Sequence, residues 1–241
     1  MPNLRSSGWR RALTVLAGLL ILKVTLGVLL VYRDYLPPNF ESEFLRGRHS
    51  YFFGPYQWAF YTHIASGPIT LILGLILISE RFRLRFPTWH RSLGKSQILL
   101  VVLLLAPSGL WMARYAESGA VAGAGFGTLA IVTATCALFG WRSAVKRKFS
   151  EHRRWMWRCF LCLCSAVVLR LIGGLSIVTD VGAGWSYPLA AWVSWLAPLG
   201  VFESSGVIRR QLRGFGIFEQ GHSAPSGSAL SPAAMEISAR R

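Results

Sequence analysis

The chain has 241 residues, of which 53% are hydrophobic and only 15% are charged, and its mean hydropathy is +0.42. This balance excludes an ordinary soluble domain, in which about 25% of residues are charged. The net charge of +16 does not indicate a nucleic-acid partner, because the basic residues lie in clusters that long apolar runs separate. Composition therefore predicts a polytopic membrane protein.

Six apolar runs are long enough to cross a hydrocarbon layer about 30 Å thick. They cover residues 12–32, 57–79, 96–114, 121–141, 155–179 and 187–207. The first ends in "VLLVYRDY" without a small-residue cleavage site, so we expect an uncleaved anchor helix. We predict an all-α integral membrane protein with six transmembrane helices within residues 1–207, followed by a largely disordered cytoplasmic tail over 208–241.

Basic residues are divided unequally between the two sides that this topology creates. One side carries 20 of the 26 lysines and arginines, in the amino-terminal segment, the loops at 80–95 and 142–158, and the tail. The other side carries four: Arg33, Arg46, Arg48 and Arg114. The positive-inside rule then predicts that both termini are cytoplasmic, in a bacterial inner membrane.

The only sizeable outer segment covers residues 33–56 and reads "RDYLPPNFESEFLRGRHSYFFGPY". Its alternation of aromatic and charged residues favours a piece that lies along the membrane interface as an aromatic belt. The alternative is a lid over a cavity that opens outward. The spacing of Gly119, Gly123 and Gly127 in "GAVAGAGFG" indicates close helix packing.

The two cytoplasmic loops resemble each other. A shift of 62 residues superposes "ERFRLRFPTWHRSLGK" on "SAVKRKFSEHRRWMWR" and predicts two pseudo-repeated helical hairpins, formed by spans two–three and four–five. It aligns Arg85 with Arg147, Thr88 with Ser150, His90 with His152, and Arg91 with Arg153. We expect each hydroxyl residue to be a helix N-cap, with the His–Arg pair in the first turn, where the helix dipole favours anions.

The two His–Arg pairs, His90–Arg91 and His152–Arg153, are therefore candidates for contact with a cytoplasmic anion or a lipid headgroup. They could be interfacial anchors that bind lipid phosphates, or they could bind a specific anionic ligand or supply a catalytic histidine. Both interpretations remain open at this stage.

Four motifs together resemble a bacterial family of predicted membrane proteins, catalogued as domain of unknown function 2306. They are "FYTHIASG", "PTWHRSLGK", "HRRWMWR" and "LRL", and the resemblance covers about residues 60–180. The markers are His63, His90, Arg91, Gly94, His152, Arg153, Trp155, Met156 and Arg170. The resemblance implies a membrane protein and no established activity.

Three side chains that carry or can accept a positive charge lie within the predicted spans. Helix geometry places Lys23, His63 and Arg170 at about the same depth, roughly 9–14 Å from the outer boundary. No acidic residue lies at that level. Because an unpaired intramembrane charge costs at least about 2.5 kcal/mol, these three residues are the candidates for a ligand-binding centre.

Three interpretations of Lys23, His63 and Arg170 remain open. In the structural one, Lys23 extends toward the interface and Arg170 bonds helix carbonyls, nearby hydroxyls and trapped water. In the ligand interpretation, Arg170 and His63 bind an anionic or carbonyl-bearing molecule such as a quinone, a lipid headgroup or a small carboxylate. In the third, His63 belongs to a proton relay.

Haem b is a possible cofactor, because a helical bundle with scattered histidines can supply two axial ligands. Only His90 with His152, or His49 with His63, could pair across facing elements. The cysteines, with Cys159, Cys162 and Cys136 on adjacent helices, are interpreted as small apolar filling rather than metal ligands. No catalytic motif is present, so a ligand-binding, transport or sensing protein is predicted, with a membrane redox protein as the alternative.

Overall fold

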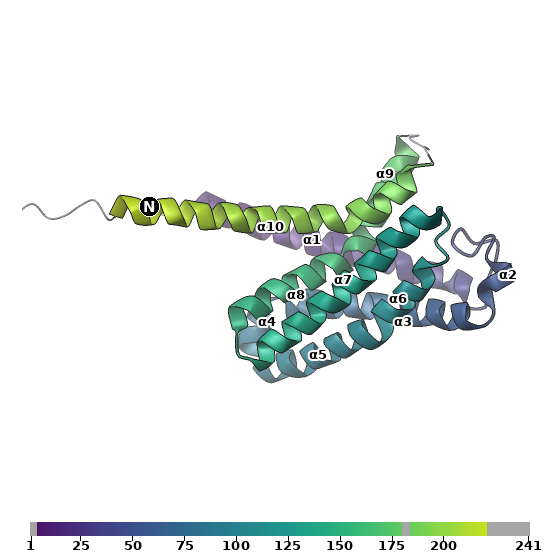
Figure 1. Ribbon diagram of the computed structural model, residues 1–241, viewed down its shortest axis with the longest axis horizontal. Coiled ribbons are helices and arrows are strands. Elements are labelled where there is room, and N and C mark those ends of the chain that lie inside the picture. Colours follow the sequence, from purple (N-terminus) through teal and green to yellow (C-terminus); the bar gives the residue numbers. More distant parts are fainter. Residues whose placement is uncertain (1–3, 180–183, 221–241) are drawn as a thin grey trace, which may run out of the picture. The chain divides into compact units, whose positions relative to one another are not determined.

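The computed structural model describes residues 4–179 and 184–220, and this part of the chain is helical, with no strand (Figure 1). The elements are α1 (Leu4–Val31), η1 (Tyr32–Tyr35), α2 (His49–Phe52), α3 (Pro55–Leu77), α4 (Glu80–Arg85), α5 (Pro87–Leu99), η2 (Leu100–Leu105), α6 (Ala106–Ala113), α7 (Gly119–Val145), α8 (Phe149–Leu163), α9 (Ser165–Val178) and α10 (Ser186–Gln220). The chain divides into two compact units, residues 1–200 and 201–241.

Five helical segments are long and apolar enough to cross a membrane, which confirms the predicted class. They are Ala12–Tyr35, Pro55–Leu77, Pro87–Ala113, Gly119–Val145 and Phe149–Val178. The sixth predicted span falls in α10, which is not among these five within the described part of the chain, so the count of six stays a prediction. Helix α10 continues to Gln220, and residues 221–241 of the predicted tail lie outside the described residues.

The prediction that Thr88 and Ser150 cap their helices is wrong. Helix α5 begins at Pro87 and α8 at Phe149, so each hydroxyl residue lies one position inside its helix, and neither N-cap residue makes a side-chain cap hydrogen bond. The two starts are nonetheless equivalent. The backbone N–H of His90 donates to the Phe86 carbonyl, and that of His152 donates to the Lys148 carbonyl, both at 2.9 Å.

Small residues allow the neighbouring helices to approach closely. A β-carbon at Gly123 would lie 2.7 Å from the Ala113 carbonyl oxygen, and one at Gly127 would lie 3.5 Å from Leu110 Cδ1. The predicted packing role of these two glycines is confirmed. Gly119 differs, because no atom lies within 4 Å of its β-position and its φ of +78° is a left-handed conformation at the start of α7.

Segment 33–56 folds into a packed cluster of aromatic side chains. Leu45, Phe52, Tyr56 and Phe60 form a buried core that we call the aromatic cap. The partly buried side chains packed against it are Tyr35, Phe40, Phe44, Tyr51, Tyr61, Ile64, Met112 and Tyr115. A folded structure forms here because so many aromatic rings can bury their area against α3 and α6.

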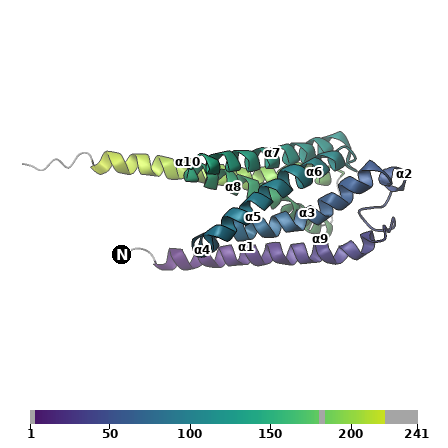
Figure 2. The ribbon, with the colours of Figure 1, turned by 90° about the horizontal axis from the view of Figure 1, so that it is seen from below.

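The aromatic cap is joined to the rest of the bundle by Arg48, whose side chain is only 6% exposed. Its guanidinium donates to the Phe44 carbonyl at 2.6 Å, the Tyr115 carbonyl at 2.9 Å and the Tyr51 hydroxyl at 3.1 Å. A weak ion pair with Glu117 at 3.4 Å completes its environment. Figure 2 shows α1 alongside α3. The aromatic cap lies where α1 ends and α3 begins.

Candidate functional site

Pro68 disturbs α3 at the level where the sequence predicts a polar centre. A proline has no N–H, so the Ile64 carbonyl, four residues earlier, loses its usual helical partner. The Tyr32 hydroxyl donates to this carbonyl at 2.5 Å instead. The proline thus creates an acceptor on α3 that fixes the end of the first span beside His63.

His63 lies on α3 against α6. Its Nδ1 is 3.3 Å from the Ser108 hydroxyl oxygen, and the Ser108 hydroxyl donates to the Leu104 carbonyl at 2.6 Å. Because that hydroxyl has a single proton, the arrangement favours Nδ1–H as the donor to Ser108 and leaves Nε2 as an acceptor. Gly109 provides the space, since a β-carbon there would lie 3.1 Å from His63 Cε1.

The helix that carries Ser108 is irregular next to His63. Residues Leu100–Leu105 form a π-helical segment, in which the Ala106 N–H donates to the Val101 carbonyl five residues earlier. Pro107 follows immediately and cannot donate to a carbonyl of this segment. Such π-segments often occur at functional sites, and this one supplies the carbonyls that surround the Ser108 hydroxyl.

Arg170, on α9, lies close to this group. Tyr32, Tyr35, Tyr187 and His63 are near enough to its guanidinium for a charge on one group to affect the other. Its guanidinium donates to the Ala166 carbonyl of its own helix at 2.9 Å, and the residue is exposed. No carboxylate among the described side chains of residues 12–179 and 184–205 forms a salt bridge with it. We use the term polar centre for Arg170, His63, Ser108, Tyr32, Tyr35 and Tyr187.

Lys23, the third candidate at this level, has a different environment. It is exposed on α1, whose apolar side chains around it, such as Leu22 and Leu26, are exposed as well. Among the described residues it is not one of the groups that interact with Arg170 or His63. The structure therefore brings together two of the three predicted ligand candidates and leaves Lys23 apart.

The four candidates at the other end of the bundle lie at the starts of α5 and α8. The Nδ1 of His152 is 2.9 Å from the Gly140 carbonyl, so this nitrogen carries the proton and Nε2 is an acceptor. The Nδ1 of His90 is buried without a hydrogen-bond partner. His90 interacts electrostatically with His152, whereas Arg91 and Arg153 are exposed.

The histidines considered as haem ligands lie in different environments. His49 is exposed on α2 and packs edge-on against Phe40, with ring centroids 4.7 Å apart. His90 and His152 are the two histidines that interact with each other, at the ends of their spans. The cysteines are buried and reduced, and Cys162 contacts Cys136. Within the described part of the chain, no group of three or more metal-ligating side chains converges.

Sequence reasoning did not identify the tyrosines of the polar centre or the role of Arg48. Tyr32 and Tyr35 look like ordinary interfacial aromatics, and Tyr187 is 17 residues beyond Arg170. One available signal was Pro68, since the carbonyl of residue 64 needs another donor. No comparable signal marks Arg48, because its partners include the backbone carbonyl of residue 115, 67 positions away.

The chain matches the model of a known protein family. The model of the DUF2306 family, described as a predicted membrane protein, matches residues 60–203. This region includes most of α3, all of α4 to α9, His63 and Arg170. No curated protein and no solved structure matches the chain.

Proposed function

The chain belongs to the DUF2306 family of predicted membrane proteins, and we propose that it binds a ligand at the polar centre of the membrane domain. The ligand would be an anionic or carbonyl-bearing molecule, such as a quinone, a lipid headgroup or a small carboxylate. In this proposal the protein lies in a bacterial inner membrane with both termini cytoplasmic, as the distribution of basic residues indicates.

The observation that carries this proposal is the environment of Arg170. The ionisable groups near its guanidinium are an imidazole and three phenols, and none of them carries a negative charge at neutral pH. One hydrogen bond to the Ala166 carbonyl occupies one of its five N–H donors. A guanidinium in a membrane span needs acceptors, and an oxygen-bearing ligand beside it would supply them.

The polar centre offers both kinds of hydrogen-bonding group. Arg170 provides donors that suit a carboxylate, a phosphate or a carbonyl oxygen, whereas His63 Nε2 can accept a proton or a hydrogen bond. Most side chains of α1 and α3 are apolar, although α3 also carries Thr62, Ser66 and Thr70. The ligand is therefore expected to combine a polar head with an apolar body.

A thermal-shift experiment tests this proposal. The purified protein would be heated with a short-chain ubiquinone analogue, with decanoate or with phosphatidylglycerol, because a ligand that binds the folded state raises the unfolding temperature. We expect one of these three compounds to raise the unfolding temperature of the parent and of Lys23→Met. The same compound should leave the unfolding temperature of Arg170→Met unchanged. Equal responses of Arg170→Met and the parent to every probe would contradict the proposal.

A second candidate function is that of a membrane redox protein, and one observation favours it. The imidazoles of His90 and His152 are near enough for a charge on one to affect the other. The hydrogen bond of His152 Nδ1 to the Gly140 carbonyl leaves its Nε2 available. A hydrogen-bonded Nδ1 of this kind is typical of histidines that bind iron through Nε2. A Soret band after haem-replete expression, lost in His152→Ala, would support this function.

A further inference from the structure

The turn between α7 and α8 has an arginine in a conformation that favours glycine. Arg147 has a φ of +57°, and it is the one non-glycine residue with positive φ in the described part of the chain. The Lys148 N–H donates to the Ser143 carbonyl at 2.9 Å, and the Arg147 N–H donates to the Ala144 carbonyl at 3.0 Å. These two bonds form a Schellman motif that ends α7, with Arg147 at the position where glycine is most common.

An arginine at this position strains the folded state. In the left-handed conformation its Cβ lies too close to the following carbonyl oxygen, and glycine avoids this clash. Such strain persists where the side chain contributes something that glycine cannot. Arg147 forms no salt bridge with another described residue and its side chain is exposed, so its contribution to the folded protein alone is small.

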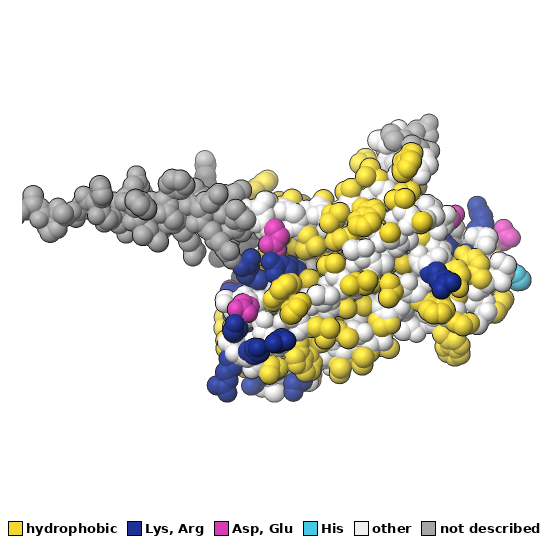
Figure 3. Space-filling view, in the orientation of Figure 1, with side chains coloured by type: hydrophobic (Ala, Val, Ile, Leu, Met, Phe, Trp, Pro, Cys, Tyr) yellow, Lys and Arg dark blue, Asp and Glu magenta, His cyan; other side chains and the backbone are white. Residues whose placement is uncertain are grey.

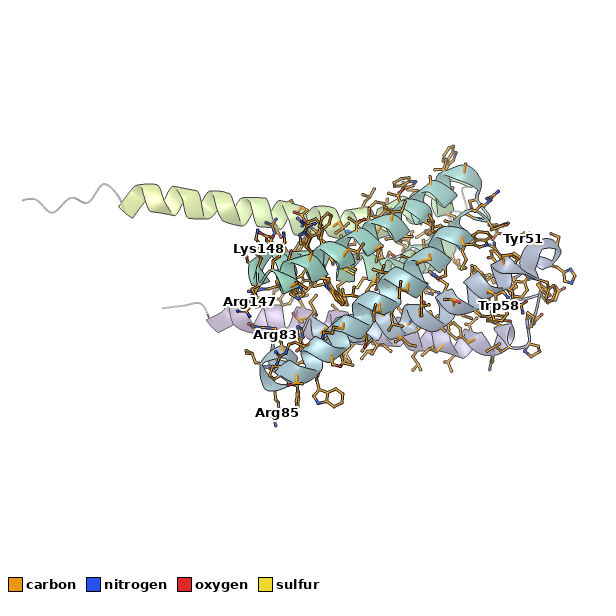
Figure 4. The ribbon with its side chains drawn as sticks, turned by 60° about the horizontal axis from the view of Figure 1, so that its bottom comes forward. Tyr51, Trp58, Arg83, Arg85, Arg147 and Lys148 are labelled. Carbon is orange, nitrogen blue, oxygen red and sulfur yellow. The ribbon has the colours of Figure 1, made fainter. Side chains whose placement is uncertain are left out.

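Arg147 belongs to a strongly basic surface, which we call the basic end. Figure 4 labels Arg83, Arg85, Arg147 and Lys148 at one end of the helices, opposite Tyr51 and Trp58. The exposed basic residues here are Arg81, Arg83, Arg85, Arg91, Lys95, Arg142, Lys146, Arg147, Lys148, Arg153 and Arg154. Figure 3 shows dark blue side chains gathered on this end with few acidic ones. Among the described residues, Arg83 pairs with Glu80 at 3.1 Å and Lys148 pairs with Glu151 at 3.2 Å.

Exposed aromatic rings lie beside these cations. Phe86 is 44% exposed, Trp89 63% and Phe149 64%, and all three belong to the first turns of α5 and α8 or the residue before them. A site for a soluble anion would not need such rings. Aromatic side chains next to arginine and lysine at the end of a membrane span instead mark the depth of the lipid headgroups.

We propose that the α7–α8 turn, Lys146–Arg147–Lys148, binds the phosphates of anionic phospholipids together with the arginines of α4. The charge of the turn supplies the attraction, the aromatic rings set the depth, and headgroup binding offsets the strain at Arg147. This surface lies at the opposite end of the spans from the aromatic cap and is independent of the polar centre.

The strain makes the test specific. Arg147→Gly removes one charge and the strain together, so we expect dioleoyl phosphatidylglycerol to bind about fivefold more weakly, the loss typical of one basic residue at a membrane surface. The unfolding temperature in neutral detergent should be unchanged or up to about 3 °C higher. Native mass spectrometry with added phosphatidylglycerol or phosphatidylcholine measures the first quantity, and a thermal melt measures the second.

Three controls complete the experiment. Arg147→Lys should bind phosphatidylglycerol like the parent. Lys146→Gln should lose a similar factor in binding without a gain in stability, because Lys146 has an ordinary φ of −77°. Arg46→Gln, on the aromatic-cap side, should change neither quantity. Unchanged phosphatidylglycerol binding by Arg147→Gly would overturn the proposal, as would equal binding of phosphatidylcholine, or displacement of the lipid by millimolar inorganic phosphate.

Discussion

The imidazole Nδ1 of His63 lies 3.3 Å from the Ser108 hydroxyl oxygen, across the contact between α3 and α6. This relationship depends on three local irregularities in the two helices. Pro68 interrupts the hydrogen bonding of α3, the π-helical segment precedes Ser108, and Gly109 leaves room for the ring. The position of the histidine is therefore set by the backbone of two helices rather than by side-chain packing alone.

The first prediction concerns Gly109→Ala. A β-carbon there would lie 3.1 Å from His63 Cε1, so the ring must move by a few tenths of an ångström. We expect a loss of stability of about 1 kcal/mol or less and weaker ligand binding. Gly67→Ala is the matched control, because its nearest neighbour, Leu105 Cδ1, lies at an ordinary 3.9 Å. Ligand-dependent thermal shifts of the two variants should differ; equal shifts would show that the position of His63 is unimportant.

Helix packing gives a second prediction, on the glycines of α7. A β-carbon at Gly123 would approach the Ala113 carbonyl oxygen to 2.7 Å, and this backbone atom cannot move without shifting α6. Gly123→Ala should destabilise the protein by about 1–3 kcal/mol. Gly127→Ala, whose nearest contact is 3.5 Å, should cost less than about 0.5 kcal/mol. The unfolding temperatures of the two variants would be measured in the same detergent. An unfolding temperature of Gly123→Ala as high as that of Gly127→Ala would contradict the packing.

A third prediction concerns Arg48. Its removal leaves the Phe44 and Tyr115 carbonyls without this donor, in a cap whose core is buried. Arg48→Met should lower stability by about 2 kcal/mol or more, and limited proteolysis should then cut segment 33–56 faster. Arg46→Met is the control, since Arg46 is exposed and donates to the Glu41 carbonyl at 3.1 Å. Similar cleavage rates for both variants would argue against a structural role of Arg48.

The proposed orientation of the protein rests on the distribution of its basic residues, and cysteine labelling tests it. In a background without the four native cysteines, Ser50→Cys should react with an impermeant maleimide in intact spheroplasts. Lys148→Cys should react only after the membrane is opened. Both positions are exposed, so access to the reagent depends on the side of the membrane. Labelling of Lys148→Cys in sealed spheroplasts would reverse the proposed topology.

Much of the fold was predictable from the sequence, because apolar runs about twenty residues long dictate membrane helices. Hydropathy placed the third span only from residue 96, because residues 87–95 are too polar. The helix start before it was predicted from Thr88 as N-cap, within two residues of the observed start at Pro87. The aromatic cap was missed as a folded unit. Its rings come from a segment without helical periodicity, and only tertiary contacts with α3 and α6 organise them.

The candidate site was partly predictable for a similar reason. Depth along a helix follows from residue counting, so Arg170 and His63 could be placed at one level. Residue counting does not show which way a side chain faces around the helix axis, or which helices lie next to each other. These features separate Lys23 from the polar centre and bring Tyr32, Tyr35 and Tyr187 to Arg170.

The most direct test of the polar centre is native mass spectrometry of the protein extracted with its surrounding lipid. We predict a bound molecule in the parent and in Lys23→Met that is absent from Arg170→Met and from His63→Ala. Arg170→Met should melt within about 2 °C of the parent, because Arg170 bonds only its own helix among the described residues. His63→Ala should melt about 2–5 °C lower, because it loses the contact with Ser108 and leaves a space beside Gly109. Stable variants with an unchanged set of bound molecules, or a parent without any, would contradict ligand binding at this centre.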